Sequence, residues 1–224
     1  MTSIMFTYTE ENYLKAIYHL TEGDTASVST NAIAEAVDTR PASVTDMLRK
    51  LAAKDLIHYI KYQGVSLTDS GQAIALQVIR KHRLWETFLV EKLKFQWDQV
   101  HEVAEQLEHI QSPLLIERLD ELLGYPQFDP HGDPIPDQRG RIQATPRLPL
   151  NEAPHHQPLT VEGVRETSPL FLQYLDKLAI TIGARVQVLD RVEFDQSLEI
   201  SIEARPSQIV SREVGENIYV SVDS

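Results

Sequence analysis

The chain has 224 residues, of which 42% are hydrophobic and 24% are charged, as expected of a folded protein with room for two or three small domains. It contains no cysteine, which excludes disulfides and thiolate metal sites. No apolar run approaches the ~20 residues that a membrane-spanning helix needs, and the first residues lack the pattern of a secretion signal. We therefore expect a cytoplasmic protein without a membrane partner.

The net charge of −12 argues at first against nucleic-acid binding, but the charge is unevenly distributed. Residues 40–83 carry eight basic side chains against three acidic ones, a local charge of +5, whereas the rest of the chain carries −17. Phosphate binding requires a local basic patch, whatever the total charge. The charge distribution is therefore compatible with DNA binding, and on charge alone a solvated basic face is an equal alternative.

The N-terminal third, residues 1–72, has the pattern of a winged helix-turn-helix domain. Apolar residues at helical spacing predict a first helix around residues 9–18, a second at 30–37 and a third at about 42–54. Residues 56–67 alternate in polarity around Gly64, which predicts a two-stranded wing. The alternative is a three-helix scaffold with an unrelated hairpin.

In the third helix one face is apolar, and the opposite face carries short polar groups followed by bases. Such a helix suits the major groove, where its N-terminal end reaches base edges. The candidate DNA contacts lie on this face, just before it and at the wing tip: Arg40, Ala42, Ser43, Thr45, Asp46, Arg49, Lys50 and Lys61.

The central segment, residues 73–140, gathers imidazoles and carboxylates on two predicted helices, at about 69–95 and 99–109. One helix places a histidine and a glutamate one turn apart, and the other presents two of each within roughly 100° of arc. The six candidate ligands are His82, Glu86, His101, Glu105, Glu108 and His109. Oxygen and imidazole ligands without sulfur suit manganese, iron(II) or zinc, so the pattern predicts one or two metal sites. A single pair of this kind would be an ordinary surface contact.

A further helix follows Ser112-Pro113, which form a helix cap with proline at the first helical position. It is apolar over much of its circumference, which predicts a partner, most simply a second copy in a symmetric dimer. The alternative is that this helix closes the domain's own core.

Prolines are dense from Tyr125 to Pro158, so we expect an extended segment there, with residues 141–158 as a proline-rich linker. Residues 159–224 predict a short helix at 170–175 and strands around 186–188, 198–202 and 218–222, with Gly183 and Gly215 in turns. The predicted fold is therefore mainly α with a small β-barrel domain.

Several short motifs, in this order and spacing, resemble the diphtheria toxin repressor family, which includes iron-dependent and manganese-dependent repressors of bacteria. The resemblance covers nearly the whole chain. The motifs are Glu11-Asn12-Tyr13-Leu14-Lys15, Lys81-His82-Arg83-Leu84, Val100-His101-Glu102, Glu108-His109 and Gly132-Asp133-Pro134-Ile135-Pro136. The resemblance implies a winged helix-turn-helix domain, a helical dimerisation and metal-binding domain, and an SH3-like, FeoA-type barrel.

The same resemblance implies two metal positions per subunit of a DNA-binding homodimer. His82, Glu86 and His101 fall on the ancillary position. The regulatory position takes Asn12, Glu105, Glu108 and His109. Glu105 favours Mn(II) over Fe(II), because iron sensors often carry cysteine there, whereas Asn12 is neither the methionine of iron sensors nor the aspartate of manganese sensors.

We therefore expect a metal-activated repressor of metal-ion uptake genes, not an enzyme, that binds double-stranded operator DNA. One alternative is a winged-helix regulator that senses an organic ligand. The other is a metallohydrolase with Glu108 as its base, since residues 105–109 resemble an inverted zinc-protease helix in which glutamate replaces the first histidine.

Overall fold

The computed structural model describes residues 6–21, 27–60, 63–143 and 147–223, and the chain forms two compact units. The first unit comprises residues 1–82, 105–116 and 136–142, and the second comprises 83–104, 117–135 and 143–224. Three helices, α4 (Asp69–Glu91), α5 (His101–Leu107) and α6 (Pro113–Leu122), contribute residues to both units. Among the described residues, no helix is both long enough and apolar enough to cross a bilayer.

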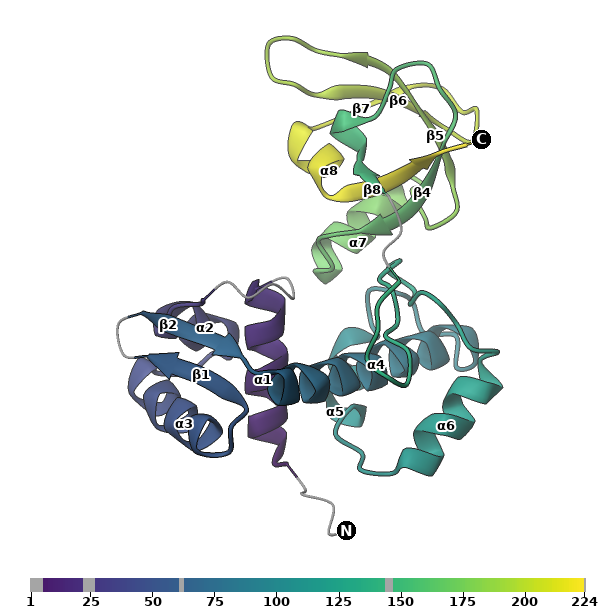
Figure 1. The fold of residues 1–224 in the computed structure, drawn as a ribbon. Coiled ribbons are helices and arrows are strands. Elements are labelled where there is room, and N and C mark those ends of the chain that lie inside the picture. The colour runs from purple at the N-terminus through teal and green to yellow at the C-terminus, as the bar shows by residue number, and fades with distance from the viewer. Residues whose placement is uncertain (1–5, 22–26, 61–62, 144–146, 224) are drawn as a thin grey trace. The chain divides into compact units, whose positions relative to one another are not determined.

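The N-terminal part of the first unit is a winged helix-turn-helix domain, as predicted (Figure 1). Its elements are α1 (Tyr8–Thr21), α2 (Thr30–Ala36), α3 (Pro41–Ala53), β1 (Ile57–Ile60) and β2 (Gly64–Leu67). The helices share one core with the hairpin, built from Tyr13, Leu14, Ile17, Val28, Ile33, Ala34, Val44, Leu48, Leu51, Leu56, Ile57, Val65 and Ala75. Each fully buried leucine or isoleucine contributes roughly 1.5–3 kcal/mol of hydrophobic free energy.

Local signals in the sequence set the helix starts and the wing. The Ser29 hydroxyl accepts the amide of Ala32 at the start of α2, and Pro41 occupies the first turn of α3. Gly64 opens β2 with φ +106°, and a β-carbon there would lie 3.0 Å from the Val28 carbonyl oxygen, so glycine is required. Lys61, predicted at the wing tip, lies outside the described residues.

The two helices expected to carry the metal ligands are shorter than predicted. Helix α4 ends at Glu91, and α5 spans only His101–Leu107. Glu108 and His109 therefore lie in the turn that follows α5, and Pro113 then starts α6. The helix predicted from apolar periodicity was too long at its C-terminal end, because Ile110 continues the apolar stripe beyond the last helical residue.

The stretch around residues 129–136 is packed rather than extended, which corrects the expectation for the proline-rich segment. The Asp129 carboxylate accepts the amides of His131 at 2.8 Å and Asp133 at 3.0 Å. A β-carbon on Gly132 (φ +86°) would lie 2.1 Å from the carbonyl oxygen of Glu162, so only glycine fits against the backbone of residues 159–164. Side-chain bonds to backbone thus replace regular secondary structure, and hydropathy does not reveal them.

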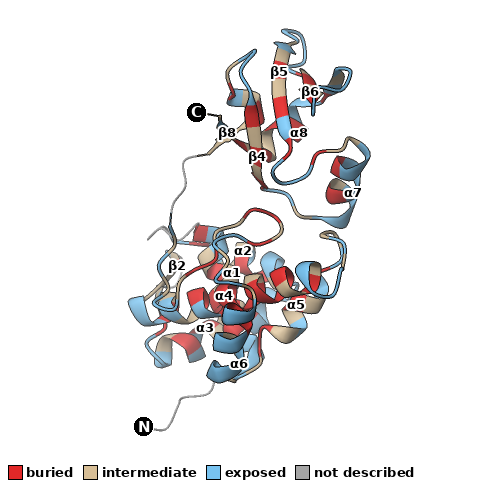
Figure 2. Ribbon diagram, turned by 90° about the vertical axis from the view of Figure 1, so that its right-hand side faces the viewer, coloured by how far each residue is buried: buried red, intermediate tan, exposed pale blue. Residues whose placement is uncertain are grey.

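The second unit ends in a six-stranded antiparallel sheet with strand order β3-β8-β4-β5-β6-β7. The strands are β3 (Leu148–Pro149), β4 (Leu159–Val164), β5 (Arg185–Arg191), β6 (Leu198–Ile202), β7 (Gln208–Val210) and β8 (Ile218–Val222). Two helices accompany it, α7 (Pro169–Lys177) and α8 (Arg212–Glu216), with a 3-10 turn at Leu150–Glu152. Buried residues alternate along the strands, as Figure 2 shows for β4 and β5.

The barrel differs from its prediction at three places. Leu148 pairs with Val220 and Leu150 is buried in the barrel core, although both fall within residues 141–158, where we expected linker. Strands β4 and β7 were not predicted, and Gly215 lies inside α8 rather than in a turn. Strand β7 has only three residues, too few to show a period of two, and Gly163 interrupts the alternation of β4, where the register shifts.

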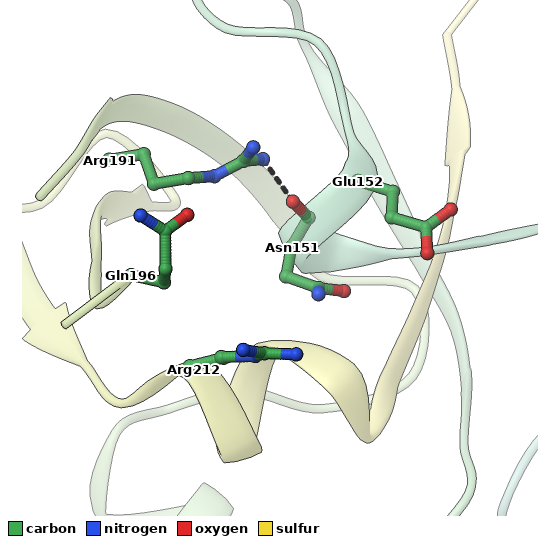
Figure 3. Close-up of a pocket in the computed structure, with 5 residues that line it drawn as sticks. All are labelled: Asn151, Glu152, Arg191, Gln196 and Arg212. Atoms are coloured by element: carbon green, nitrogen blue, oxygen red, sulfur yellow. Dashed lines mark hydrogen bonds between the residues drawn. The ribbon is translucent and has the colours of Figure 1, made fainter. Parts of the chain in front are cut away.

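A polar pocket of about 550 Å³ opens in the barrel, lined by Asn151, Glu152, Arg191, Gln196 and Arg212. Figure 3 shows the Arg191 guanidinium bonded to the backbone carbonyl of Asn151. Within the described chain, Asn151 Oδ1 and Arg191 Nε are buried without a hydrogen-bond partner. Of the predicted metal and DNA residues that the structure describes, none lines this pocket.

Candidate metal centre and DNA-binding face

The first unit brings together two carboxylates and an imidazole that were predicted as ligands. Ligand atoms of His82, Glu105 and Glu108 all lie within 4.8 Å of one another. His82 Nδ1 is 2.6 Å from Glu108 Oε2 and 3.9 Å from Glu105 Oε1. Glu108 is fully buried, and because a buried carboxylate is stable only with charged or hydrogen-bonding partners, the cluster is well suited to hold a cation. The structure thus pairs His82 with a residue of the regulatory set.

His109, also predicted as a ligand, is held by a carboxylate on α1. Its Nδ1 lies 2.6 Å from Glu11 Oε2, while its Nε2 faces Glu108 Oε1 at 3.6 Å. The Tyr8 ring stacks on the imidazole at 4.7 Å between centroids. Since the Glu11 contact places the proton on Nδ1, the lone pair of Nε2 points toward the carboxylate cluster, as a metal-binding imidazole requires.

Glu11 is the centre of its own group of partners. It accepts a hydrogen bond from Gln111 Nε2 at 2.8 Å and faces Lys81 Nζ at 3.5 Å. Burial lowers the pKa of Lys81, and the neighbouring Glu11 opposes that shift. The ammonium of Lys81 and the amide of Gln111 therefore fix the carboxylate that orients His109.

The side chain of Asn12 has a buried oxygen that could bind a cation. It lies on α1 between Glu11 and Lys15, both of which contact the cluster. Its Oδ1 is buried and has no hydrogen-bond partner among the described residues. An unpaired buried carbonyl oxygen costs about 1–3 kcal/mol, and a divalent cation would satisfy it. The residues present therefore fit a hard divalent ion.

The ammonium of Lys15 contacts both carboxylates of the cluster. Its Nζ lies 2.5 Å from Glu105 Oε1 and 2.7 Å from Glu108 Oε1. Burial alone would raise the pKa of Glu108, but the His82 and Lys15 contacts outweigh it and hold the pKa below its ordinary value. Glu108 is therefore ionised at neutral pH, as a metal ligand must be.

Two of the three residues predicted for the ancillary position meet in the second unit. Glu86 Oε1 lies 3.5 Å from His101 Nδ1, and Glu86 Oε2 lies 3.6 Å from Nδ1 of His131. His82 precedes Glu86 by four residues on α4. His131 donates from Nε2 to the carbonyl of Trp97 at 2.9 Å, and Asp129 completes a group of three buried potential ligands with Glu86.

Five charged or titratable residues of these clusters were not predicted as site residues: Glu11, Lys15, Lys81, Asp129 and His131. Glu11 and Lys15 are four residues apart on one face of α1 and flank the predicted ligand Asn12, a spacing that could have revealed them. His131 lies in a histidine-glycine turn between two aspartates, which offered a weaker signal.

The predicted DNA contacts of α3 lie on its solvent-facing side. Arg40, Ala42, Ser43, Asp46, Arg49 and Lys50 are exposed and Thr45 is half-buried. Arg49 Nη1 pairs with Asp46 Oδ1 at 3.2 Å, a contact that holds the guanidinium along the helix. A hollow of about 390 Å³ lies beside this face, lined in part by Ser43, Asp46 and Lys50.

Fold and site together define a winged-helix DNA-binding protein with a buried carboxylate and imidazole cluster suited to a divalent cation. Three family models match the chain in series: "Iron dependent repressor, N-terminal DNA binding domain" over residues 5–65, "Iron dependent repressor, metal binding and dimerisation domain" over 68–137, and the FeoA domain over 148–222. The diphtheria toxin repressor of Corynebacterium efficiens is 32% identical over 192 residues, which cover 81% of this chain and 83% of that protein. The chain therefore belongs to the diphtheria toxin repressor family of metal-dependent transcriptional repressors.

Other relatives extend this likeness. The iron-dependent repressor IdeR of Mycobacterium tuberculosis is 34% identical over 128 residues, so the match spans 57% of this chain and only about half, 55%, of IdeR. A manganese-dependent transcriptional repressor in complex with manganese is similar in structure, with a TM-score of 0.85 and 35% identity over 95% of this chain and 99% of that one. The manganese regulator SloR gives a TM-score of 0.75 and 33% identity over 96% and 98% of the two chains.

Proposed function

We propose that this protein represses metal-ion uptake genes by binding operator DNA as a homodimer when a divalent ion, Mn(II) rather than Fe(II), fills its regulatory site. The observation that carries this proposal is the cluster of Glu105, Glu108 and His109, whose side chains contact residues of α1, the first helix of the DNA-binding domain. The manganese-dependent relatives named above support the choice of metal, as does the carboxylate at position 105.

The ligands of the regulatory site are Asn12, Glu105, Glu108 and His109, with His82 beside Glu108. Asn12 on α1 and the residues at the end of α5 would hold a divalent ion, which would supply positive charge to the buried carboxylates. The chain's own contribution is orientation: Glu11 fixes the imidazole of His109, and His82 donates to Glu108. A second ion at His82, Glu86 and His101 is the remaining part of the proposal, supported by the Glu86–His101 contact.

Dimerisation is supported by α6, which exposes Leu114 (62%), Leu115 (39%) and Leu122 (58%). Leucines at these exposures on one helix are typical of a subunit interface. In a dimer, metal-held domains would set the separation of two α3 helices to match successive major grooves. Family membership favours this regulator over the organic-ligand sensor and the metallohydrolase that the sequence left open.

The test is binding of metal-stripped protein to its own promoter fragment, followed by fluorescence anisotropy and titrated separately with Mn(II), anaerobic Fe(II) and Zn(II). We expect Mn(II) to tighten DNA binding by roughly 5- to 150-fold, and Glu105→Ala and Glu108→Ala to remove that response. Stronger activation by Fe(II) would overturn the assignment of the metal. DNA binding that ignores all three metals and a chelator would overturn the switch itself.

A further inference from the structure

The ammonium group of Lys15 lies between the carboxylates of Glu105 and Glu108, two ligands of the proposed regulatory site. Its ammonium lies 2.5 Å from Glu105 Oε1 and 2.7 and 2.9 Å from the two oxygens of Glu108. The Lys15 side chain is only 12% exposed and that of Glu108 is 0% exposed. Lysine ammonium groups are rarely buried to this extent unless they are fully paired.

The oxygens that Lys15 contacts are the ones a divalent ion would need. Zinc binds carboxylate oxygens at about 2.0–2.2 Å, which is shorter than the distances between the Lys15 ammonium and these oxygens. A carboxylate cannot lie at bonding distance from both cations along the same direction. Binding of the ion on the side of Glu105 and Glu108 that the ammonium occupies therefore requires the Lys15 side chain to move away.

The charge of the cluster leads to the same conclusion. Three carboxylates, Glu11, Glu105 and Glu108, face two ammonium groups, Lys15 and Lys81, while the imidazoles of His82 and His109 complete the surroundings. With neutral imidazoles the net charge is −1, which a divalent ion would overcompensate. Once Lys15 withdraws the charge is −2, which a divalent ion neutralises.

We propose that Lys15 is a tethered cation that competes with the divalent ion for Glu105 and Glu108 and thereby sets the metal concentration at which the site fills. This inference rests on the proposed function. In the metal-free protein Lys15 stabilises the buried Glu108, and in the metal-bound protein the ion takes over that role. Since the competitor is covalently attached, its local concentration is constant.

The experiment measures Mn(II) binding to the metal-stripped full-length protein by isothermal titration calorimetry, in wild type, Lys15→Met and Lys15→Gln. We expect both Lys15 variants to bind Mn(II) at least about tenfold more tightly, equivalent to roughly 1.4 kcal/mol. The matched control is Lys54→Met, which removes another ammonium of the same unit, paired with Glu10 at 2.6 Å. Its Mn(II) affinity should equal that of wild type.

Thermal unfolding provides a second readout that does not depend on DNA. In a chelator, Lys15→Met should melt below wild type because Glu108 loses its ammonium partner, and Mn(II) should raise its Tm by more than it raises the wild-type Tm. A variant that folds only when Mn(II) is present would support the proposal, because the ion would then replace the ammonium.

Two results would overturn the inference while leaving the proposed function intact. One is a Lys15 variant that binds Mn(II) with wild-type affinity or more weakly, and the other is an equal Mn(II)-induced rise in Tm in variant and wild type. If neither wild type nor the variants bound Mn(II), Fe(II) or Zn(II), the proposed function would fail and the inference with it.

Discussion

Glu11 and His109 form a hydrogen bond of 2.6 Å that links the first turn of α1 to the turn after α5. The contact fixes the imidazole so that Nε2 faces the buried Glu108 at 3.6 Å. Glu11 is 4% exposed and is held in turn by Gln111 and Lys81. Glu11 is not itself a predicted metal ligand, but it thus sets the direction in which the imidazole of His109 can bind a metal ion.

Replacing Glu11 by glutamine should therefore weaken metal binding without removing a ligand. We expect Glu11→Gln to lower Mn(II) affinity about 10-fold, at the low end of what the loss of an orienting partner costs. Calorimetric titration of metal-stripped protein measures the change. Glu10→Gln is the matched control, because Glu10 is the adjacent buried carboxylate but pairs with Lys54. Equal affinities of the two variants would contradict the orienting role.

Asn12 tests whether an amide oxygen is part of the site. Its buried, unpaired Oδ1 predicts that Asn12→Ala weakens Mn(II) binding, whereas Asn12→Asp strengthens it because a charged oxygen is the better ligand. In the presence of a chelator, Asn12→Asp should melt at a lower temperature than wild type, because a further carboxylate then lies on α1 between Glu11 and Lys15. Mn(II) affinities unchanged in both variants would exclude Asn12 as a ligand.

The fold was predictable from the sequence to the extent that local patterns determine it. Apolar periodicity predicted α1, α2 and α3, and proline or serine at a helix start fixed where α3 and α6 begin. Packing of the segment around Asp129 and His131 was not predictable, because it depends on side-chain bonds to backbone rather than on hydropathy.

The candidate site was predictable in its residue types but not in its partners. Glu105 and Glu108 were recognised because they share a stripe with histidines, whereas Lys15 lies about 90 residues earlier, on a separate helix. Contacts between elements far apart in the sequence leave no periodic signal. The pairing of His82 with Glu108, a residue of the other predicted set, is a contact of this kind.

The exposed face of α3 predicts two classes of DNA-binding variant. Arg49→Ala and Lys50→Ala should weaken binding to operator and to unrelated DNA alike, and each should reduce the salt slope of the affinity by about 1. Ser43→Ala should weaken binding to the operator alone, by about 1 kcal/mol. Anisotropy titrations over a range of salt concentrations separate the two classes. Lys177→Ala, an exposed base on α7, is the control, and a loss as large as that of Arg49→Ala would contradict the assignment of the α3 face.

The leucines of α6 predict the oligomeric state. Leu114 is 62% exposed, so Leu114→Glu should leave the subunit folded but bury a charge in any interface that covers this helix. We expect light scattering to show a shift from dimer to monomer and circular dichroism to remain unchanged. Leu170→Glu on α7, at 82% exposure, should leave the dimer intact. A Leu114→Glu protein that stays dimeric would place the interface elsewhere.

The buried His131 makes the stability of the metal-free protein depend on pH. Burial alone would lower the pKa of His131, but its contacts with Glu86 and Asp129 raise it to about 9. Because this value exceeds the unfolded value of about 6.5, the stabilisation is complete below pH 6.5 and is lost as the pH rises through 9. Burial and the neighbouring Glu86 raise the pKa of Asp129 to about 7. Ionisation of this carboxyl group therefore also lowers the stability of the folded protein as the pH rises.

Urea unfolding of chelator-treated protein at pH 6.5, 8 and 9 measures this dependence. Wild type should lose stability steadily over that range, and His131→Gln should lose clearly less, because the imidazolium no longer pairs with Glu86. His156→Gln replaces an exposed histidine and should follow wild type. Parallel curves for wild type and His131→Gln would show that His131 is not the charged partner of Glu86 in the folded protein.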